Sequence, residues 1–391
     1  MRTKQGLTGS RSERAAGAEK KNIAIVITRL DLGGAQKTAL CLARKLDRKK
    51  FNVHFIAGRG GYLDRVLTGA EKRSYKGVVV NLWDEIAHPI SPLLDSIAVF
   101  KLARYFKRNN MEIVNTHSSK AGILGRKAAM LAGVKRVYHT VHGFPFHEYQ
   151  NPTAHFFYVM IEKIFAKITT KLIAVGRDTA EYGIKKGVGD AGMYEIIRAG
   201  IETAAFKGKK PKDRAFLKKH GLDPRKFTAG MIGNLKKQKN PDGFIAAAKA
   251  ALKAEPDMQF VFAGGSAAGA QEGYESSEKI KFIGWTGEPG RFMRAIDIFF
   301  LPSLWEGLPC TLVQALCAGK PCVASDIGGN REILELAGDK RLLYNPKSPE
   351  DAAALIAGIK RGKIKPAKIK SAALKEFDED YMVREYERVF K

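Results

Sequence analysis

An acidic residue and an amide flank the start of a predicted helix within residues 301–322, LPSLWEGLPCTLVQALCAGKPC. Glu306 stands in the turn after an apolar run, Pro309 is typical of a first helical position, and Gln314 follows eight residues after Glu306. A carboxylate there can accept hydrogen bonds from ligand hydroxyls, while the free N–H groups of the helix start can bind phosphate. The alternative is that Glu306 only stabilises the positive end of the helix dipole.

Lysines precede another predicted helix in the segment GNLKKQKNP at 233–241. Lys236, Lys237 and Lys239 stand just before an Asn-Pro pair, which is a strong helix-start signal. Cations beside a helix N-terminus suit a diphosphate, although a lysine run is also typical of a solvated surface.

A glycine pair, Gly33-Gly34, follows the first predicted strand and opens the first predicted helix. Glycine lets the backbone approach a ligand closely, and the helix start offers N–H groups to an anion. The pattern is not G-x-G-x-x-G, so it gives little support to nicotinamide binding, and it is also compatible with an ordinary turn.

Polar side chains also follow two neighbouring strands, in the motifs THSSKAG and YHTVHGF. His117, Ser118 and Lys120 come at the end of the first of these strands and at the start of a helix, and His142 follows the second. His139 lies within its strand and is expected to face the core. His117 and His142 either contact a ligand beside the glycine pair or are structural, and a serine here can be a plain helix cap.

The elements that must position these residues form two successive halves with the same pattern. Apolar runs rich in β-branched residues alternate with amphipathic runs, first from residue 22 and again from near residue 227. Strands that are apolar throughout and separated by helices indicate parallel sheets covered on both faces. We predict an α/β protein with two Rossmann-like, doubly wound domains, which bind ligands at the carboxyl ends of their strands, facing an interdomain cleft. Its parts are a tail (1–21), an N-terminal domain (22–203), a C-terminal domain (204–375) and a final helix (376–391).

Composition sets the class of protein. The chain has 391 residues, 45% of them hydrophobic, with 39 glycines, which suits two globular domains. No apolar run is long enough to span a bilayer, and the first 21 residues are basic, polar and without the apolar core of a secretory signal. The four cysteines match no zinc spacing, so buried thiols in a reducing cytoplasm are expected.

The net charge of +27 comes from 67 basic and 40 acidic residues and is spread along the whole chain. Such a field attracts polyanions: nucleic acid, anionic lipid headgroups or phosphorylated small molecules. Charge alone does not choose among them.

Several ordered motifs together resemble one family. The segment EGLPCTLVQALCAGKPCVASDIGGNREIL resembles the donor-site signature of retaining GT-B glycosyltransferases of family four. GGAQKTALCLA, THSSKAGILGRKAA, HTVHGFPF and AVGRDTAEYGIKKGVG resemble its bacterial surface-polysaccharide members. The likeness covers about residues 22–391 and includes a final helix that, in the family, crosses back to the N-terminal domain.

The resemblance implies a nucleotide-sugar donor held mainly by the C-terminal domain and an acceptor held mainly by the N-terminal one. It implies that Glu306 holds hydroxyls of the transferred sugar, that His117 lies near the sugar's 6-position, and that Lys239 contacts the diphosphate; these three are the predicted catalytic residues. The predicted donor-binding residues are Gly33, Gly34, Gly233, Asn234, Lys236, Trp285, Leu308, Pro309, Cys310, Thr311 and Gln314, and those on the acceptor side are His142, Ser118 and Lys120.

Two positions depart from the family pattern. Asn234 stands where the family usually has arginine, so one guanidinium of the phosphate clamp is replaced by an amide, and Lys236 or Lys237 must compensate or the donor binds more weakly. Gln314 stands where the family has glutamate. An amide both donates and accepts, so the ribose hydroxyls can still be satisfied, with an expected loss of about 1 kcal/mol in donor affinity.

The sequence therefore predicts a retaining, metal-independent hexosyltransferase. Its donor is a UDP- or GDP-linked sugar, it needs no cofactor or metal, and its acceptor is a saccharide, expected to be linked to a polyprenyl diphosphate, for surface polysaccharide synthesis. Basic segments such as DRKKF, KLARYFKRNN and the N-terminal tail suit a peripheral position on the inner face of the cytoplasmic membrane. The alternatives are a hydrolysing nucleotide-sugar 2-epimerase of the same fold, a catalytically inactive glycosyltransferase and a basic nucleic-acid-binding protein, although no nucleic-acid recognition motif is present.

Overall fold

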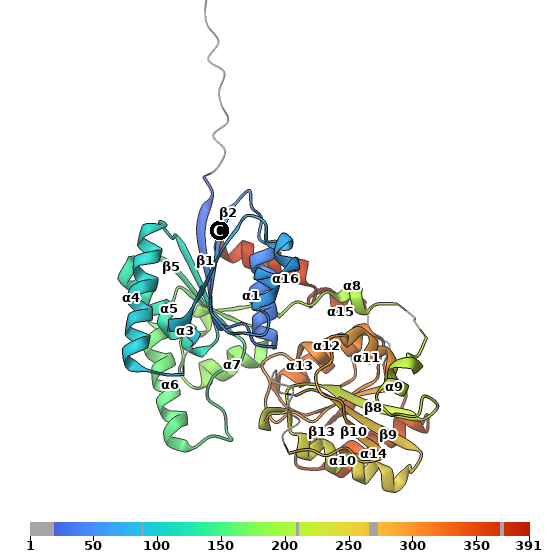
Figure 1. Cartoon of the computed structure of the whole chain (residues 1–391). Helices are drawn as coiled ribbons and strands as arrows, with labels where there is room; N and C mark the ends of the chain where they lie inside the picture. Colours follow the sequence, from blue (N-terminus) through green and yellow to red (C-terminus); the bar gives the residue numbers. More distant parts are fainter. Residues whose placement is uncertain (1–18, 88, 209–210, 266–272, 368–370) are drawn as a thin grey trace, which may run out of the picture.

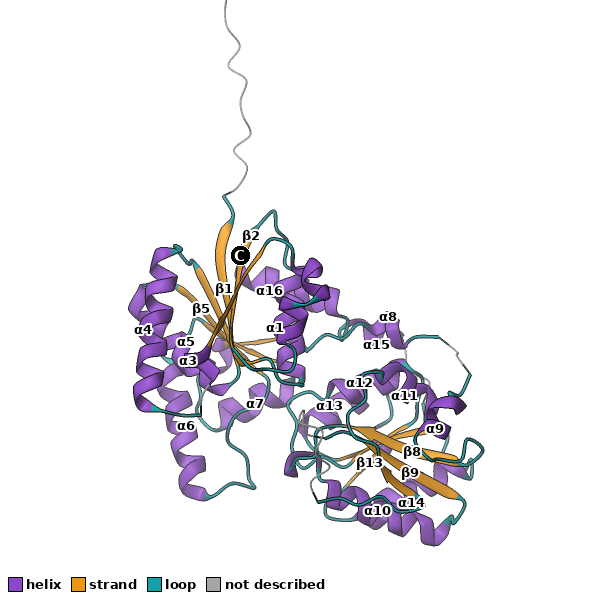
Figure 2. Cartoon of the chain, in the orientation of Figure 1, coloured by secondary structure: helices purple, strands orange, loops and turns teal. Residues whose placement is uncertain are grey.

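Two parallel sheets, each covered by helices, make up the molecule (Figures 1 and 2). A computed structural model describes residues 19–87, 89–208, 211–265, 273–367 and 371–391. The predicted α/β class with two doubly wound sheets is confirmed. Most of the predicted tail, residues 1–18, lies outside the described residues, and the predicted domain boundaries stay predictions.

The first sheet has seven strands in the order β3-β2-β1-β4-β5-β6-β7, all paired in parallel. The strands are β1 (Lys21–Arg29), β2 (Phe51–Gly58), β3 (Val78–Trp83), β4 (Ile113–His117), β5 (Arg136–Val141), β6 (Lys171–Ala174) and β7 (Tyr194–Ile196). The helices are α1 (Gly34–Lys45), α2 (Asp64–Thr68), α3 (Asp84–Ala87), α4 (Pro92–Arg108), α5 (Ser119–Ala132), α6 (Pro152–Ala166) and α7 (Arg177–Lys185), with short 3₁₀ turns at Ala70–Tyr75 and Ala191–Met193.

Alternate residues of the central strand β1 pack on opposite helical layers. Ile23, Ile25 and Ile27 belong to the core shared with α1, whereas Ala24 and Val26 belong to the core shared with α4 and α5. A strand buried on both faces reads as a continuous apolar run, which is why NIAIVIT shows no alternation. The order reverses between β1 and β4, and doubly wound sheets bind their ligands at the carboxyl ends of the strands at such a point.

The second sheet has six strands in the order β10-β9-β8-β11-β12-β13. The strands are β8 (Phe227–Ile232), β9 (Met258–Ala263), β10 (Ile280–Phe282), β11 (Ile298–Leu301), β12 (Cys322–Ser325) and β13 (Leu343–Tyr344). The helices are α8 (Thr203–Phe206), α9 (Arg214–Lys219), α10 (Pro241–Ala254), α11 (Pro289–Ala295), α12 (Cys310–Cys317), α13 (Gly328–Leu336), α14 (Pro349–Lys360), α15 (Ser371–Lys375) and α16 (Glu379–Phe390), with 3₁₀ turns at Lys237–Lys239 and Lys340–Leu342.

The last helix, α16, packs on the first sheet and not on the second (Figure 1). Its residues Met382, Tyr386 and Phe390 are buried in the core that contains α1. Lys45 Nζ and Asp380 Oδ1 form an ion pair of 2.6 Å between α1 and this helix. The chain end therefore ties the two halves together, as the family resemblance implies.

Three helices show detail that short sequence patterns do not reveal. α13 begins at Gly328, because the Gly-Gly turn already has helical geometry. The short helix α8 spans the predicted boundary between the two domains, at residues 203 and 204. The helix α6 at 152–166 is not evident from the sequence, because apolar residues occupy both of its faces and hide the period of 3.6.

Candidate functional site

The starts of helices α1 and α12 face each other between the two sheets. A Cβ atom placed on Gly34, the first residue of α1, would lie 3.6 Å from the Sγ atom of Cys310, the first residue of α12. Neither helix start has a side-chain cap. Uncapped N–H groups and the positive ends of two helix dipoles therefore converge on the same space. This arrangement favours the binding of an anion that contacts both helix starts.

Gly307 allows this close approach of the two halves. A Cβ atom at Gly307 would lie 2.0 Å from the carbonyl oxygen of His142, which follows β5 in the first sheet. Gly329 packs on the other side, since its Cβ atom would lie 2.3 Å from the carbonyl oxygen of Gly307. The glycine after Glu306 is thus required by backbone packing between the halves.

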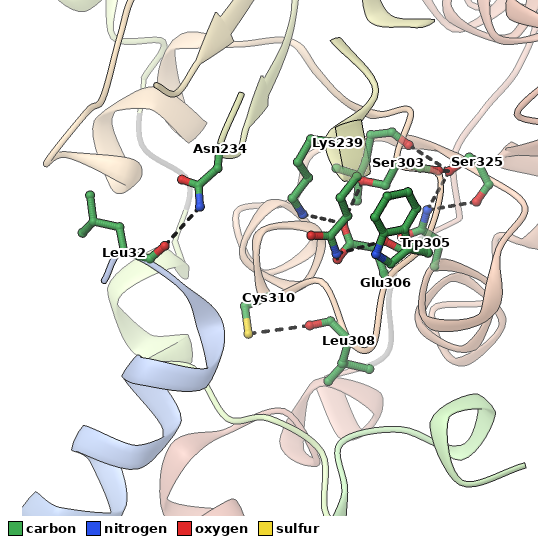
Figure 3. A network of polar contacts seen from close by, with 12 residues as sticks. Leu32, Asn234, Lys239, Ser303, Trp305, Glu306, Leu308, Cys310 and Ser325 are labelled. Carbon is green, nitrogen blue, oxygen red and sulfur yellow. Dashed lines mark hydrogen bonds and ion pairs between the residues drawn. The ribbon is translucent and has the colours of Figure 1, made fainter. Parts of the chain in front are cut away.

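Glu306 is the centre of a polar network (Figure 3). Lys239 Nζ forms an ion pair with Glu306 Oε1, and Ser303 Oγ donates a hydrogen bond of 2.7 Å to the same oxygen. Gln238 Nε2 donates to the other carboxylate oxygen at 3.4 Å. The structure therefore brings two of the predicted catalytic residues, Glu306 and Lys239, into direct contact.

The loop after β8 presents Lys239 to this network. A Cβ atom at Gly233 would lie 3.1 to 3.3 Å from the side-chain carbons of Lys239, so glycine leaves room for the lysine stem. Asn240 has a positive φ of 51° and its side chain caps α10 at Gly243. This turn aims Lys239 inward, whereas Lys236 is exposed.

Asn234, one of the two positions that depart from the family pattern, links the two halves. Its Nδ2 atom donates a hydrogen bond of 3.2 Å to the carbonyl oxygen of Leu32, just before α1 (Figure 3). The amide therefore holds the loop after β8 against the loop that leads into α1.

His117 and His142 contact each other at the neighbouring ends of β4 and β5. His117 Nδ1 and His142 Nε2 are 2.9 Å apart, and the rings are stacked. Burial lowers the pKa of His142 to about 4, and burial together with the neighbouring His142 lowers the pKa of His117 well below its usual range. Both rings are therefore neutral at physiological pH. Within the described residues, His117 Nε2 is buried without a hydrogen-bond partner.

The other predicted residues on the acceptor side have structural partners. Ser118 Oγ lies 2.7 Å from Thr28 Oγ1, which joins the ends of β4 and β1. Lys120 forms an ion pair of 2.7 Å with Asp95 of α4. These contacts direct Lys120 toward α4. His139 is buried and bonds Thr116 Oγ1 at 2.9 Å, so its predicted position in the core is confirmed.

The remaining predicted donor residues lie on or next to α12. Leu308 and Pro309 are buried just before it, and Gln314 is 6% exposed on it. Thr311 Oγ1 is buried without a partner in the described part of the chain. Trp285 is half-buried after β10, at the carboxyl edge of the second sheet. Burial raises the pKa of the Cys310 thiol, so this cysteine stays protonated. Cys310 is half-buried, whereas the other three cysteines are buried as expected.

Sequence reasoning missed several neighbours of the site. Ser303 and Gln238 bond Glu306, and Lys37 of α1 is close enough to Cys310 to act on its thiol electrostatically. Lys37 could have been suspected from its place one turn after Gly34. The ring of Trp305 stacks on His147 of the first half, with centroids 3.9 Å apart, and no sequence pattern reveals that pairing.

Comparison with known proteins identifies the family. The description "Glycosyltransferase Family 4" matches residues 32–205, and "Glycosyl transferases group 1" matches residues 212–376. A UDP-Gal:alpha-D-GlcNAc-diphosphoundecaprenol alpha-1,3-galactosyltransferase of Escherichia coli is 33% identical over 307 residues, which cover 76% of this chain and 78% of the relative. The chain belongs to the family-four glycosyltransferases of the GT-B fold. Glycosyltransferase activity follows from that membership.

Solved structures with the same fold include nucleotide complexes. HepE of Anabaena in complex with UDP and glucose matches with a TM-score of 0.76 and 19% identity, over 95% of this chain and 99% of that one. The lipopolysaccharide outer core galactosyltransferase WaaB matches with a TM-score of 0.65 and 17% identity, over 94% of this chain and 99% of that one. At these identities the likeness shows the fold alone.

The described residues include neither a membrane-spanning helix nor a metal-binding cluster. No helix among them is both long and apolar enough to cross a bilayer. No group of three or more histidine, cysteine or acidic side chains among them is arranged to hold a metal ion.

Proposed function

We propose that this glycosyltransferase moves a hexose from a nucleoside diphosphate sugar to a lipid-linked saccharide, with retention of the anomeric configuration. The observation that carries the proposal is the Lys239–Glu306 pair beside the facing starts of α1 and α12. One cationic and one anionic side chain, next to two helix N-termini, match the two ends of such a donor: a diphosphate and a polyhydroxylated sugar.

The diphosphate end is the leaving group, and its charge grows as the glycosidic bond breaks. The starts of α1 and α12 meet at Gly34 and Cys310, and the ammonium of Lys239, paired with Glu306, is close enough to Cys310 to act on its thiol electrostatically. Preorganised donors aimed at developing charge supply the largest part of many rate enhancements. These groups, rather than a metal ion, are proposed to stabilise the leaving diphosphate, with no added cofactor.

The sugar end faces Glu306 and His117. Glu306 is held in place by Ser303 and Gln238, so its carboxylate is oriented before the donor binds. His117 Nε2 is the buried ring nitrogen without a protein partner, and it can bond one sugar hydroxyl in either tautomer. Because Glu306 is engaged by Lys239, we assign it to holding hydroxyls and not to attack on the sugar. The departing phosphate oxygen then takes the acceptor proton on the same face, which gives retention.

A lipid-linked acceptor is supported by the relative from Escherichia coli, whose name specifies a GlcNAc-diphosphoundecaprenol substrate. The net charge of +27 favours binding to an anionic membrane surface. A peripheral position on the cytoplasmic leaflet is therefore part of the proposal.

The experiment is a transfer assay with a panel of UDP- and GDP-sugars and a synthetic polyprenyl-diphosphate GlcNAc acceptor. We expect one donor to raise the melting temperature and to yield an elongated lipid whose new anomeric centre, assigned by NMR, matches that of the donor. Release of an epimerised sugar without acceptor would instead support the 2-epimerase. Donor binding without turnover on any acceptor would support a catalytically inactive glycosyltransferase.

A further inference from the structure

The outward face of α4 is apolar in its first half and basic in its second half. Leu93, Ile97 and Phe100 lie four and three residues apart on this face and are 72%, 45% and 69% exposed. Arg104 and Lys107 continue the same face toward the helix end and are also exposed. The opposite face, with Ala98, Leu102 and Phe106, is buried in the core, so the apolar residues outside are in excess of what the fold needs.

Helix α6 repeats this pattern with bulkier side chains. Phe156 and Phe157 are 62% and 61% exposed, and Met160 and Ile164 follow them on the same side of the helix. Lys167 is exposed just after the last turn. A single exposed apolar residue is ordinary, but an outward helix face composed of them marks an interaction surface.

The two helices flank α5 and cover one side of the first sheet. Figure 1 shows α4, α5 and α6 together on the side of the N-terminal half that points away from the second sheet. Met130 and Leu131, at the end of α5, are exposed as well, at 42% and 49%. We call the outward surface of α4, α5 and α6 the outer helical face.

The outer helical face has basic residues and no unpaired carboxylate. The sequences of α4, α5 and α6 contain only two acidic residues, Asp95 and Glu162. Asp95 pairs with Lys120 at 2.7 Å, and Glu162 is buried against Arg126 at 2.9 Å. Exposed cations on the face include Arg104, Lys107, Arg108, Lys127 and Lys167.

We propose that the outer helical face docks on an anionic lipid bilayer, with the aromatic and aliphatic side chains inserted among the acyl chains and the basic residues at the headgroups. Amphipathic surfaces with aromatic residues beside lysine and arginine bind the membrane interface in this way. A second copy of the chain is the weaker candidate, because pairing this face with itself would bring cations against cations.

The placement also serves the proposed function. α4 starts after the carboxyl end of β3, and α6 starts after the loop that follows β5, so Leu93, Phe156 and Phe157 lie toward the edge of the sheet that carries His117 and His142. Docking would therefore bring the acceptor side of the site to the membrane surface. The inference rests on the proposed function in that it identifies the surface behind the proposed peripheral position, but the docking itself does not require any sugar chemistry.

The test is co-sedimentation of the full-length protein with vesicles, in the absence of nucleotide sugar and acceptor. Vesicles of phosphatidylcholine alone are compared with vesicles that contain about 30% phosphatidylglycerol, at salt concentrations from about 0.1 M to 1 M. We expect binding to the anionic vesicles that weakens steeply with salt, and at least tenfold weaker binding to phosphatidylcholine.

Two variants remove the two parts of the face. The double variant Phe156→Ser/Phe157→Ser should weaken partitioning about tenfold, since two exposed aromatic insertions are lost. The triple variant Arg104→Gln/Lys107→Gln/Arg108→Gln should weaken it about a hundredfold at low salt and little at high salt, since each cation contributes about fivefold. The controls are Val79→Ser/Ile196→Ser and Lys218→Gln/Lys249→Gln/Lys253→Gln, which change exposed residues outside the face.

Thermal unfolding of each variant shows that the fold is intact, so loss of binding is not mistaken for misfolding. Equal loss in the control variants, or wild-type binding that ignores anionic lipid, would overturn the proposal. So would light scattering that shows a dimer which Phe156→Ser/Phe157→Ser converts to a monomer, because the face would then be covered by a second copy. A protein that binds vesicles but transfers no sugar would refute the proposed function and leave the docking surface standing.

Discussion

Lys239 and Glu306 come from different loops of the second sheet and form an ion pair at the point where the two halves of the protein meet (Figure 3). The lysine side chain is 16% exposed and the carboxylate 7%. A buried pair of this kind is costly to desolvate and gives little net stability. We propose that the pair serves ligand binding beside the facing helix starts, with each partner available to a different end of the donor.

Removing either member should lower turnover strongly. We expect Lys239→Ala and Glu306→Gln to reduce kcat/KM by about a hundredfold to a thousandfold, the range seen when one preorganised charge-stabilising group is lost. Lys249→Ala, which removes an exposed lysine of α10, is the matched control and should stay within about twofold of the wild type. Unchanged turnover in both site variants would show that the site is elsewhere.

Gly307→Ala should separate the two halves of the protein. The added methyl would overlap the carbonyl oxygen of His142, and backbone atoms cannot move aside cheaply. We expect a lower melting temperature and a loss of activity of at least about tenfold. Gly287→Ala is the control, because a Cβ atom there meets nothing within 4 Å. Equal behaviour of the two variants would mean that the close approach is not needed.

The histidine pair predicts a pH dependence of stability. The pKa of His142 in the folded protein is about 4 and that of His117 is also depressed, whereas an unfolded histidine titrates near its ordinary value. Between pH ~6.5 and pH ~4 the unfolded chain therefore binds more protons than the folded one, so stability falls as the pH is lowered through this window. Urea unfolding from pH ~7 to pH ~4.5 should show a decline of about 1–3 kcal/mol that is attributable to these rings.

A variant isolates that contribution. His142→Gln removes one of the titrating rings, and the part of the decline due to His142 should disappear even if the variant is less stable at neutral pH. A slope identical to that of the wild type would contradict the buried, neutral state of His142.

Gln314→Glu restores the carboxylate that the family usually has at this position. Because a carboxylate can accept from two ribose hydroxyls, we expect the KM for the donor to fall about threefold to tenfold with kcat nearly unchanged. Steady-state kinetics with a saturating acceptor measures this split. A fall in kcat with no change in KM would place Gln314 away from the nucleotide.

The sequence predicts the individual residues of the site better than the contacts between them. The helix starts marked by Pro309 and by the Asn-Pro pair point to Glu306 and to a group of lysines from local information, and the family resemblance selects Lys239 within that group. Their contact spans 67 residues of chain and depends on how β8 and β11 pair, which no short pattern encodes. The contact of Gly307 with His142 likewise depends on how the two halves meet.

The helix α6 shows another limit of sequence reasoning. Its period is hidden because the outward residues Phe156, Phe157 and Met160 are as apolar as the inward Val159. The structure separates the two sets, and the outer helical face could be recognised only then. The basic half of α4 lies within KLARYFKRNN, a segment whose basic composition suits a membrane surface.

The most direct test of the donor site is a comparison of binding by the nucleoside diphosphate alone and by the matching nucleotide sugar, measured by calorimetry. The account predicts that Lys239→Ala weakens both ligands by about tenfold or more, because the diphosphate is common to them. It predicts that Glu306→Ala leaves the nucleoside diphosphate as tight as in the wild type, or tighter, and abolishes the additional affinity due to the sugar. If Glu306→Ala weakened the nucleoside diphosphate as much as the nucleotide sugar, the separate roles of Glu306 and Lys239 would be contradicted.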